Sequence, residues 1–196
     1  ELQSGNQTSL GKGLALLHKT SAKNNSGEFG WSSNGYIGAG PQPGGYEKKW
    51  GECFVKLRLL PQVELATEWG INRTLTRSTL LSLIAFLNSH NPSPSIVHGD
   101  LWSGNAFVNN DGRGVLIDPA TWWADREVDI AMTKMFGGFS KDFYQGYESI
   151  WPLPSCASTR IDIYNFYHLL NHANLFGGSY KNQCFSFLKR LKSKFN

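Results

Sequence analysis

Cysteine is scarce in this sequence of 196 residues, and no stretch of apolar residues is long. The three cysteines, Cys53, Cys156 and Cys184, lie far apart and form no C-x-x-C pair. A sparse and odd set predicts neither a disulfide framework nor a zinc site, and it favours a reducing compartment. No run approaches the roughly 18 apolar residues of a membrane span, and no signal-peptide pattern is visible. We therefore expect a cytoplasmic protein without a membrane partner.

Charge of one sign is not in large excess either. The formal net charge is +4, and part of it lies in "KRLKSKF" near the C-terminus. We expect this segment to be the solvated face of a last helix, and we expect no nucleic-acid partner. Hydrophobic residues make up 40% of the chain and aromatic residues 13%, which is ample for a packed core. We expect a single globular unit over residues 1–196.

Apolar periodicity predicts that most of the chain is helical. The segment 9–21 places Leu10, Leu14 and Leu17 on one helical face, with Ser9 as its N-cap. A second amphipathic helix begins near Trp50, and we expect Pro61 to interrupt or kink it. The other helices are expected at about 74–88, 125–136, 141–151, 158–175 and 182–195.

Two segments do not read as helices. Residues 24–46 are rich in glycine, with two prolines and scattered aromatic residues, which predicts an ordered loop packed on the body. Residues 96–120 contain two short β-like runs, "AFVN" and "GVLID", separated by "NDGRG". Asp-Gly between such runs is typical of a β-hairpin. The expected fold class is α+β, mostly helical, with one small hairpin.

The polar residues of 96–120 have the order and spacing that phosphoryl transfer needs. The motif is His98-x-Asp100, then Asn105, then Asp118 after the second apolar run. The reaction needs a carboxylate near the acceptor hydroxyl and oxygen ligands for Mg²⁺ on the nucleotide phosphates. Protein kinases use a loop Asp, a loop Asn and an Asp beyond a hairpin for these roles. We predict that Asp100 is the catalytic base and that Asn105 and Asp118 bind the metal.

The stretch "VHGDLWSGNAFVNNDGRGVLIDPATWWADREVDIAMTKMFGGFSKDFYQGY" resembles the fructosamine kinases (ketosamine 3-kinases), relatives of aminoglycoside phosphotransferases and choline kinases. The Trp after "HGDL", the "DPA" after the strand, "MFGGF" and "YHLLNHANLFG" point to this branch, and "YIGAGPQP" and "RLLPQ" also resemble it. The resemblance implies a protein-kinase-like C-terminal lobe that carries the catalytic motif on its hairpin.

The resemblance also implies roles for further residues. Trp102 is expected to stack on the sugar-amine substrate and His172 to line the substrate cleft, whereas His98 and Asp129 are expected to brace the catalytic loop. The alternatives are a core position for Trp102, a proton carrier for His98 and a helix N-terminal charge for Asp129. His168 and His172 have i, i+4 spacing, but with no third ligand evident we do not expect zinc there.

The N-terminal lobe of such a kinase, with its glycine-rich loop, strand Lys and paired Glu, is not recognisable here, so we expect it to be missing from this chain. "GKG" at 11–13 lacks the strand and full spacing of a phosphate loop. The resemblance implies phosphorylation, with ATP and Mg²⁺ (or Mn²⁺), of the 3-hydroxyl of small-molecule or protein-bound fructosamines or ribulosamines. The alternatives are a kinase of another hydroxylated amine, such as an aminoglycoside or choline, and a non-catalytic ketosamine-binding module. We expect residues 1–196 alone to be inactive, with a missing lobe supplied in cis if the chain is a fragment.

Overall fold

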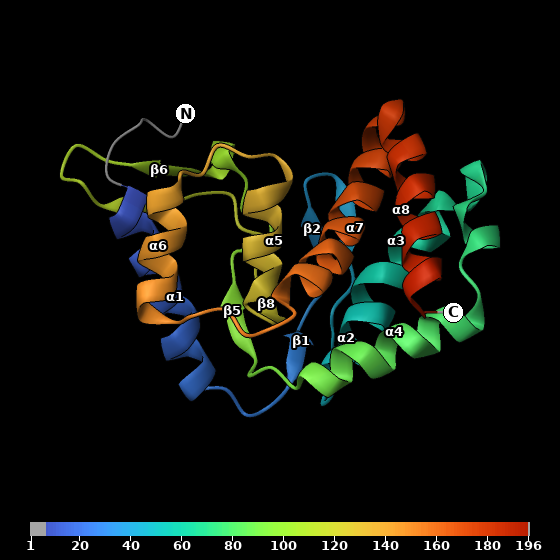
Figure 1. Cartoon of the computed structure of the whole chain (residues 1–196), viewed down its shortest axis with the longest axis horizontal. Coiled ribbons are helices and arrows are strands. Elements are labelled where there is room, and N and C mark those ends of the chain that lie inside the picture. The colour runs from blue at the N-terminus through green and yellow to red at the C-terminus, as the bar shows by residue number, and fades with distance from the viewer. Residues whose placement is uncertain (1–6, 196) are drawn as a thin grey trace. The chain divides into compact units, whose positions relative to one another are not determined.

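The structure is a computed structural model that describes residues 7–195 of the chain (Figure 1). These residues form two compact units, each built from two separate stretches of sequence. The first unit runs through Gly27 and again from Ser93 to Tyr164. The second covers Glu28–Pro92 and the residues after Tyr164. The predicted catalytic motif therefore lies within the first unit.

The first unit combines helices with two pairs of short antiparallel strands. β5 pairs with β8, and β6 pairs with β7. The elements are α1 (Gln7–Lys23), β5 (Ser95–Val97), a 3₁₀ turn (Ser103–Asn105), β6 (Ala106–Val108), β7 (Gly114–Leu116), β8 (Trp122–Ala124), α5 (Glu127–Met135), α6 (Lys141–Ile150) and the start of α7 (Ala157–Phe176).

Glycine sets the close approach of α1 and α6, which lie side by side (Figure 1). A Cβ atom at Gly11 would lie 2.0 Å from the carbonyl oxygen of Phe143, and one at Gly146 would lie 2.4 Å from the carbonyl oxygen of Thr8. At these two glycines neither helix has a side chain, so the backbones of α1 and α6 come into direct contact. The "GKG" segment at 11–13 is part of this helix pair.

The second unit is also helical, with two hairpins near its start. β1 pairs with β4, and β2 pairs with β3. Its elements are β1 (Phe29–Trp31), β2 (Gly35–Ile37), β3 (Gly40–Gln42), β4 (Gly45–Glu47), α2 (Trp50–Phe54), a π-helical segment (Val55–Leu59), α3 (Leu60–Leu65), 3₁₀ turns at Ala66–Trp69 and Ile71–Thr74, α4 (Arg77–His90), the end of α7, and α8 (Ser179–Phe195).

Aromatic rings form much of the core of the second unit. Trp50 lies between Phe29 and Phe54, with ring centroids 5.2 and 5.6 Å apart, and all three side chains are buried. Arg58 is buried as well, and its guanidinium donates to the carbonyl oxygens of Pro43 and Leu57, both at 2.8 Å. Burial lowers the pKa of Arg58. The Arg58 side chain therefore links Pro43, which follows the β2–β3 hairpin, to the π-helical segment.

The expectation of a mostly helical fold with a small hairpin is confirmed, and the hairpin pairs Ala106 with Leu116 as "AFVN" and "GVLID" predicted. The interpretation of 24–46 as a loop was incomplete, because four three-residue strands lie there. Strands this short, built partly from glycine, carry little apolar alternation. The α-helical pattern that begins at Trp50 is interrupted before Pro61 by the π-helical segment, as predicted, and Pro61 lies in the first turn of α3.

The prediction for the first helix was wrong in two respects. The helix begins at Gln7, so Ser9 is not its N-cap, and the Ser9 hydroxyl instead donates to the carbonyl oxygen of Gly112. Its buried stripe is Leu10, Leu14 and His18, whereas Leu17 is 41% exposed. No helix among residues 7–195 is long and apolar enough to cross a membrane.

The glycine contact between α1 and α6 gives a test of this packing. Gly11→Ala is expected to lower the free energy of unfolding by about 2 kcal/mol, because the new methyl group meets backbone that cannot move aside. Gly13→Ala is the matched control: Gly13 lies on the same helix with nothing within 4 Å of its Cβ position. This control is expected to raise the free energy by about 0.5–1 kcal/mol. Urea unfolding measures both, and equal effects of the two changes would contradict the packing.

Candidate active site

The loop from His98 to Asn105, which we call the 98–105 loop, is folded by its own hydrogen bonds. The Asn105 side chain donates from Nδ2 to the carbonyl oxygen of Asp100 at 3.0 Å. The backbone N–H of Asn105 donates to the carbonyl oxygen of Trp102 at 2.9 Å. The amide of Asn105 is thereby oriented, and its Oδ1 atom lies on the side away from Asp100 O.

The β6–β7 hairpin brings the second predicted metal ligand to this loop. Ile117 N donates to the carbonyl oxygen of Asn105 at 3.0 Å, one step beyond the Ala106–Leu116 pair. Asp118 therefore follows directly after the residue opposite Asn105. It is exposed and has a φ of +51°, a left-handed conformation that Asp adopts more readily than most residues. The hairpin register thus places Asn105 and Asp118 at one end of the strand pair.

His98 links the start of the loop to the end of the hairpin. Its ring is buried, Nε2 donates to the carbonyl oxygen of Ile117 at 2.8 Å, and Nδ1 accepts from the backbone N–H of Asp100 at 3.3 Å. Gly99 follows with a φ of +83°, and a Cβ there would lie 2.1 Å from the carbonyl oxygen of Ala120. Only glycine fits between His98 and Asp100 without a shift of the backbone.

Asp129, on the first turn of α5, accepts hydrogen bonds from the backbone of the same loop. Its Oδ2 accepts from His98 N at 2.7 Å and its Oδ1 accepts from Gly99 N at 2.8 Å. Burial alone would raise the pKa of Asp129. The hydrogen bond from His18, the electrostatic interactions with His18 and His98 and the Gly99 N–H lower it below its ordinary value. This carboxylate is therefore held in its charged form, bonded to two consecutive amides.

Behind Asp129 lies a buried chain of polar side chains. His18 Nε2 donates to Asp129 Oδ2 at 3.0 Å, and His18 Nδ1 lies 2.9 Å from the Tyr147 hydroxyl. Arg126 in turn donates to that hydroxyl at 3.1 Å and to the carbonyl oxygen of Trp151 at 2.7 Å. Burial raises the pKa of Tyr147, so its hydroxyl stays protonated and can donate to His18. The chain connects α1, α5 and α6 beneath the loop.

The two predicted substrate residues lie in different units. Trp102, in the 98–105 loop, is 42% exposed, so the alternative of a fully buried core position does not hold. His172 lies on α7 in the second unit, where its ring contacts Phe176 and Tyr180 with centroids 5.7 and 5.5 Å away. His98, Asp100, Asn105, Asp118 and Asp129 all share the first unit with Trp102.

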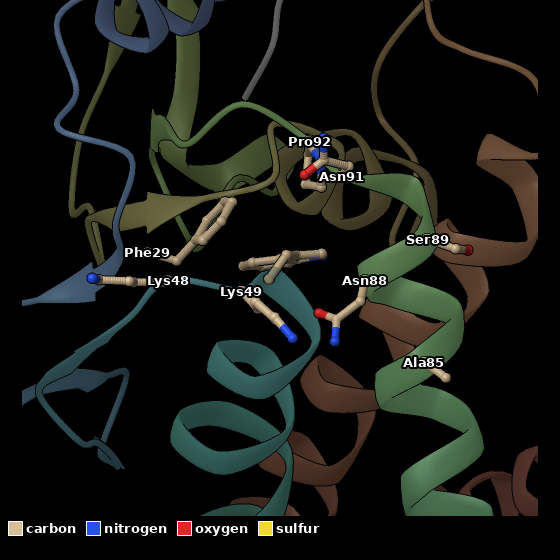
Figure 2. Close-up of a pocket in the computed structure, with 9 residues that line it drawn as sticks. Phe29, Lys48, Lys49, Ala85, Asn88, Ser89, Asn91 and Pro92 are labelled. Atoms are coloured by element: carbon tan, nitrogen blue, oxygen red, sulfur yellow. The ribbon is translucent and has the colours of Figure 1, made fainter.

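A pocket of about 410 Å³ lies in the second unit, between the start of α2 and the end of α4 (Figure 2). Lys48 and Lys49 border it, Trp50 and Phe29 form its apolar side, and Asn88 faces it from α4. The side-chain oxygen of Asn88 accepts from the N–H of Gly51, so it is engaged in holding α2. None of the predicted site residues lines this pocket.

Sequence reasoning missed His18, the side chain behind Asp129. It placed Leu17 on the buried stripe, although Leu10, Leu14 and His18 follow an equally regular i, i+4, i+8 spacing. The available signal was a polar, titratable side chain at a position of the predicted buried stripe. The contacts of Gly99 and Gly104 with the loop's surroundings had no sequence signal of this kind.

Comparison with known proteins identifies the family of this chain. A profile of the family described as fructosamine kinase matches residues 1–194. The chain is 42% identical over 181 residues to a "probable ketoamine kinase" of Synechocystis sp., covering 92% of this chain and 60% of that protein. It is 44% identical over 185 residues to one of Vibrio cholerae, covering 94% and 62%. The chain thus spans about three fifths of these relatives.

Solved structures show the same relationship. A Haemophilus somnus protein provisionally assigned as a fructosamine-3-kinase matches with a TM-score of 0.81 at 27% identity, covering 97% of this chain and 64% of that one. A Thermobifida fusca protein with the same assignment matches with a TM-score of 0.79 at 26% identity, covering 98% and 67%. The chain therefore belongs to the fructosamine kinase family, as its motifs predicted.

The Asp129 contacts predict a stability effect with a defined pH dependence. Asp129→Asn is expected to lower the free energy of unfolding by about 3 kcal/mol at neutral pH, because one of its two oxygens becomes a donor facing an N–H group. The lowered pKa of Asp129 means that the carboxylate stabilises the fold fully above its unfolded value of 3.8. The contribution is lost as the pH falls through the lower folded value.

Unfolding by urea at a series of pH values measures this effect. The difference between parent and Asp129→Asn should be constant above about pH 5 and should shrink below pH 4. Asp142→Asn, which changes an exposed carboxylate on α6, serves as the control and should alter stability by a few tenths of a kcal/mol at most. A difference that grows on acidification would contradict the charged, hydrogen-bonded state of Asp129.

Proposed function

We propose that the protein to which this chain belongs is an ATP-dependent ketoamine kinase, which phosphorylates the 3-hydroxyl of the sugar in fructosamines or ribulosamines. The observation that carries the proposal is the hairpin register, which gathers Asp100, Asn105 and Asp118 around one loop in a chain of the fructosamine kinase family. Phosphorylation of this hydroxyl on a protein-bound adduct would make the adduct labile, so the expected outcome is protein deglycation.

In this proposal Asp100 is the group that acts on the acceptor. Its carboxylate is partly exposed, while its backbone is fixed by the carbonyl bond to Asn105 and the N–H bond to His98. A carboxylate held in this way can orient the sugar hydroxyl and take its proton as the oxygen attacks the γ-phosphorus of ATP. Fixed positioning matters because phosphoryl transfer depends mainly on alignment and charge neutralisation.

Asn105 and Asp118 fit a hard divalent cation. Both offer oxygen atoms, Asn105 through Oδ1 and Asp118 through an exposed carboxylate, and no sulfur or imidazole ligand belongs to the pair. Such a set suits Mg²⁺ or Mn²⁺ rather than zinc. When bound, the metal would neutralise the charge of the nucleotide phosphates. The protein's own part is to hold the two oxygens at one end of the hairpin.

We further propose that the clamp on the nucleotide phosphates lies outside residues 1–196. The relatives are longer than this chain, which covers 60% of the Synechocystis protein. In this proposal Asp100 acts on the acceptor hydroxyl, and Asn105 and Asp118 bind the metal. A phosphate clamp of backbone amides and a Lys would supply the remaining transition-state stabilisation.

The activity prediction compares four proteins: residues 1–196, the complete product of the gene, and that product with either Asp100→Asn or the control change His90→Asn. Transfer of phosphate from ATP to a small N-alkyl fructosamine should be rapid only for the complete product. The short chain should be slower by on the order of a thousandfold, the effect of removing an electrostatic clamp. Asp100→Asn should remove the activity, while His90→Asn, a change outside the site, should not.

Robust turnover by residues 1–196 alone would show that the nucleotide is held elsewhere than proposed. If the complete product binds a fructosamine without phosphorylating it, the protein is a ketoamine-binding module. If it phosphorylates an aminoglycoside or choline faster than a fructosamine, the acceptor class is different.

The metal prediction concerns Asp118. Asp118→Asn in the complete product should weaken Mg²⁺-dependent nucleotide binding at least tenfold, because a neutral amide replaces a charged oxygen ligand. Calorimetric titration of Mg²⁺–ATP measures this effect. Asp111→Asn removes an exposed carboxylate from the tip of the same hairpin and should leave the affinity unchanged. Equal affinities for parent and Asp118→Asn would reject Asp118 as a metal ligand.

A further inference from the structure

The indole of Trp102 rests on a glycine of its own loop. A Cβ atom at Gly104 would lie 2.2 Å from Cη2 and 2.5 Å from both Cζ2 and Cζ3 of the Trp102 ring. Since the three distances are nearly equal, Gly104 lies against the face of the six-membered ring and not against its edge. One face of the indole is therefore covered by the loop backbone, although the residue as a whole is 42% exposed.

The backbone at this point has little room to move away from a larger residue. Ser103 is held on its other side by Gly138 of the α5–α6 connection, where an added Cβ would lie 2.4 Å from the Ser103 Cβ. That connection is itself bound to α1, because Ser140 N donates to Gln7 Oε1 at 2.7 Å. The N–H of Asn105 closes the turn onto Trp102 O.

A methyl group at position 104 would consequently displace the indole and not the loop. Gly104 has no left-handed φ, so alanine is compatible with its backbone conformation. The colliding atoms belong to the far end of an exposed side chain that can change its torsion angles. Gly104→Ala therefore offers a way to move Trp102 without removing it.

We propose that Gly104 is a positioning residue for the acceptor: it lets the Trp102 indole lie flat on the loop, so that the opposite face of the ring receives the ketoamine two residues from Asp100. The inference rests on the proposed function for the identity of the acceptor. An aromatic face of this kind suits a ketoamine, whose sugar presents C–H groups and whose amine is cationic at neutral pH. The size of residue 104 then sets how closely the sugar approaches.

A double-mutant cycle in the complete gene product tests this proposal. The variants are Gly104→Ala, Trp102→Ala and the double change, with Gly13→Ala as a control glycine far from any contact. Gly104→Ala is expected to raise Kd and KM for an N-alkyl fructosamine about tenfold, with kcat and the KM for ATP altered less than threefold. In the Trp102→Ala background the same change should have almost no effect, because the colliding ring is gone.

Two kinetic outcomes would overturn the proposal. The first is an unchanged KM for the fructosamine in Gly104→Ala. The second is a loss of the same size with and without Trp102, which would mean that residue 104 acts through the backbone of Asn105 instead of through the indole. A fall in kcat alone, with KM unchanged, counts with the first outcome.

A fluorescence measurement separates this inference from the proposed function. The emission due to Trp102 is the difference between parent and Trp102→Phe, and its quenching by acrylamide reports access to the ring. Gly104→Ala should increase that quenching at least twofold even if the protein neither binds nor phosphorylates a ketoamine. In that event the proposed function fails while the positioning of Trp102 stands. Unchanged quenching rejects the positioning, whatever the activity.

Discussion

A buried carboxylate in the first unit receives hydrogen bonds from two consecutive backbone amides, those of His98 and Gly99. A charged oxygen pair in a dry environment is stable only while its donors stay in place, and the donors here belong to the loop that presents Asp100. The conformation of that loop and the ionisation of Asp129 therefore depend on each other. Movement of either amide would remove one of the hydrogen bonds that offset the cost of burying the carboxylate.

The predicted catalytic and metal-binding residues take their positions from this anchored backbone. The His98 ring donates to the carbonyl oxygen of Ile117, and the Asn105 side chain donates to the carbonyl oxygen of Asp100. These bonds extend the restraint on the loop to both residues. Because Ile117 also pairs with Asn105, the hairpin and the loop share two connections near Asp118. The proposed metal ligands are thus held by short backbone segments and by few flexible side chains, which suits a reaction that depends on alignment.

Much of the site could be read from the sequence because its parts are local. His98, Asp100 and Asn105 lie within eight residues, and Asp118 follows a hairpin whose Asp-Gly turn is a strong signal. His18 could not be read in the same way, since it lies eighty residues before His98 and contacts Asp129 only through the packing of α1. The choice between Leu17 and His18 for the buried stripe is made by that packing, since neighbouring positions on a helix differ by a rotation of about 100°.

The strands within 24–46 and the π-helical form of the interruption before Pro61 were missed for a related reason. Three-residue strands gain their hydrogen bonds from a partner, so the residues of β2 and β3 show no pattern of their own. Pro61 follows a π-helical segment. The wider turn of that segment depends on the hydrogen bonds of the folded helix, and no single residue in the sequence predicts it.

Glycine has two different uses around the loop, and they bear on how the site could change in evolution or design. Gly99 has a left-handed backbone and faces the carbonyl of Ala120, so any side chain there would disturb the backbone that Asp129 holds. Gly104 has no left-handed backbone, and the three atoms nearest its Cβ position belong to the Trp102 ring, so a side chain there would disturb the proposed acceptor surface. In the proposed function the first glycine would be constrained by the position of Asp100 and the second by the fit of the acceptor. Substitutions at positions 102 and 104 would then alter the proposed acceptor surface while the backbone of Asp100 and Asn105 is retained.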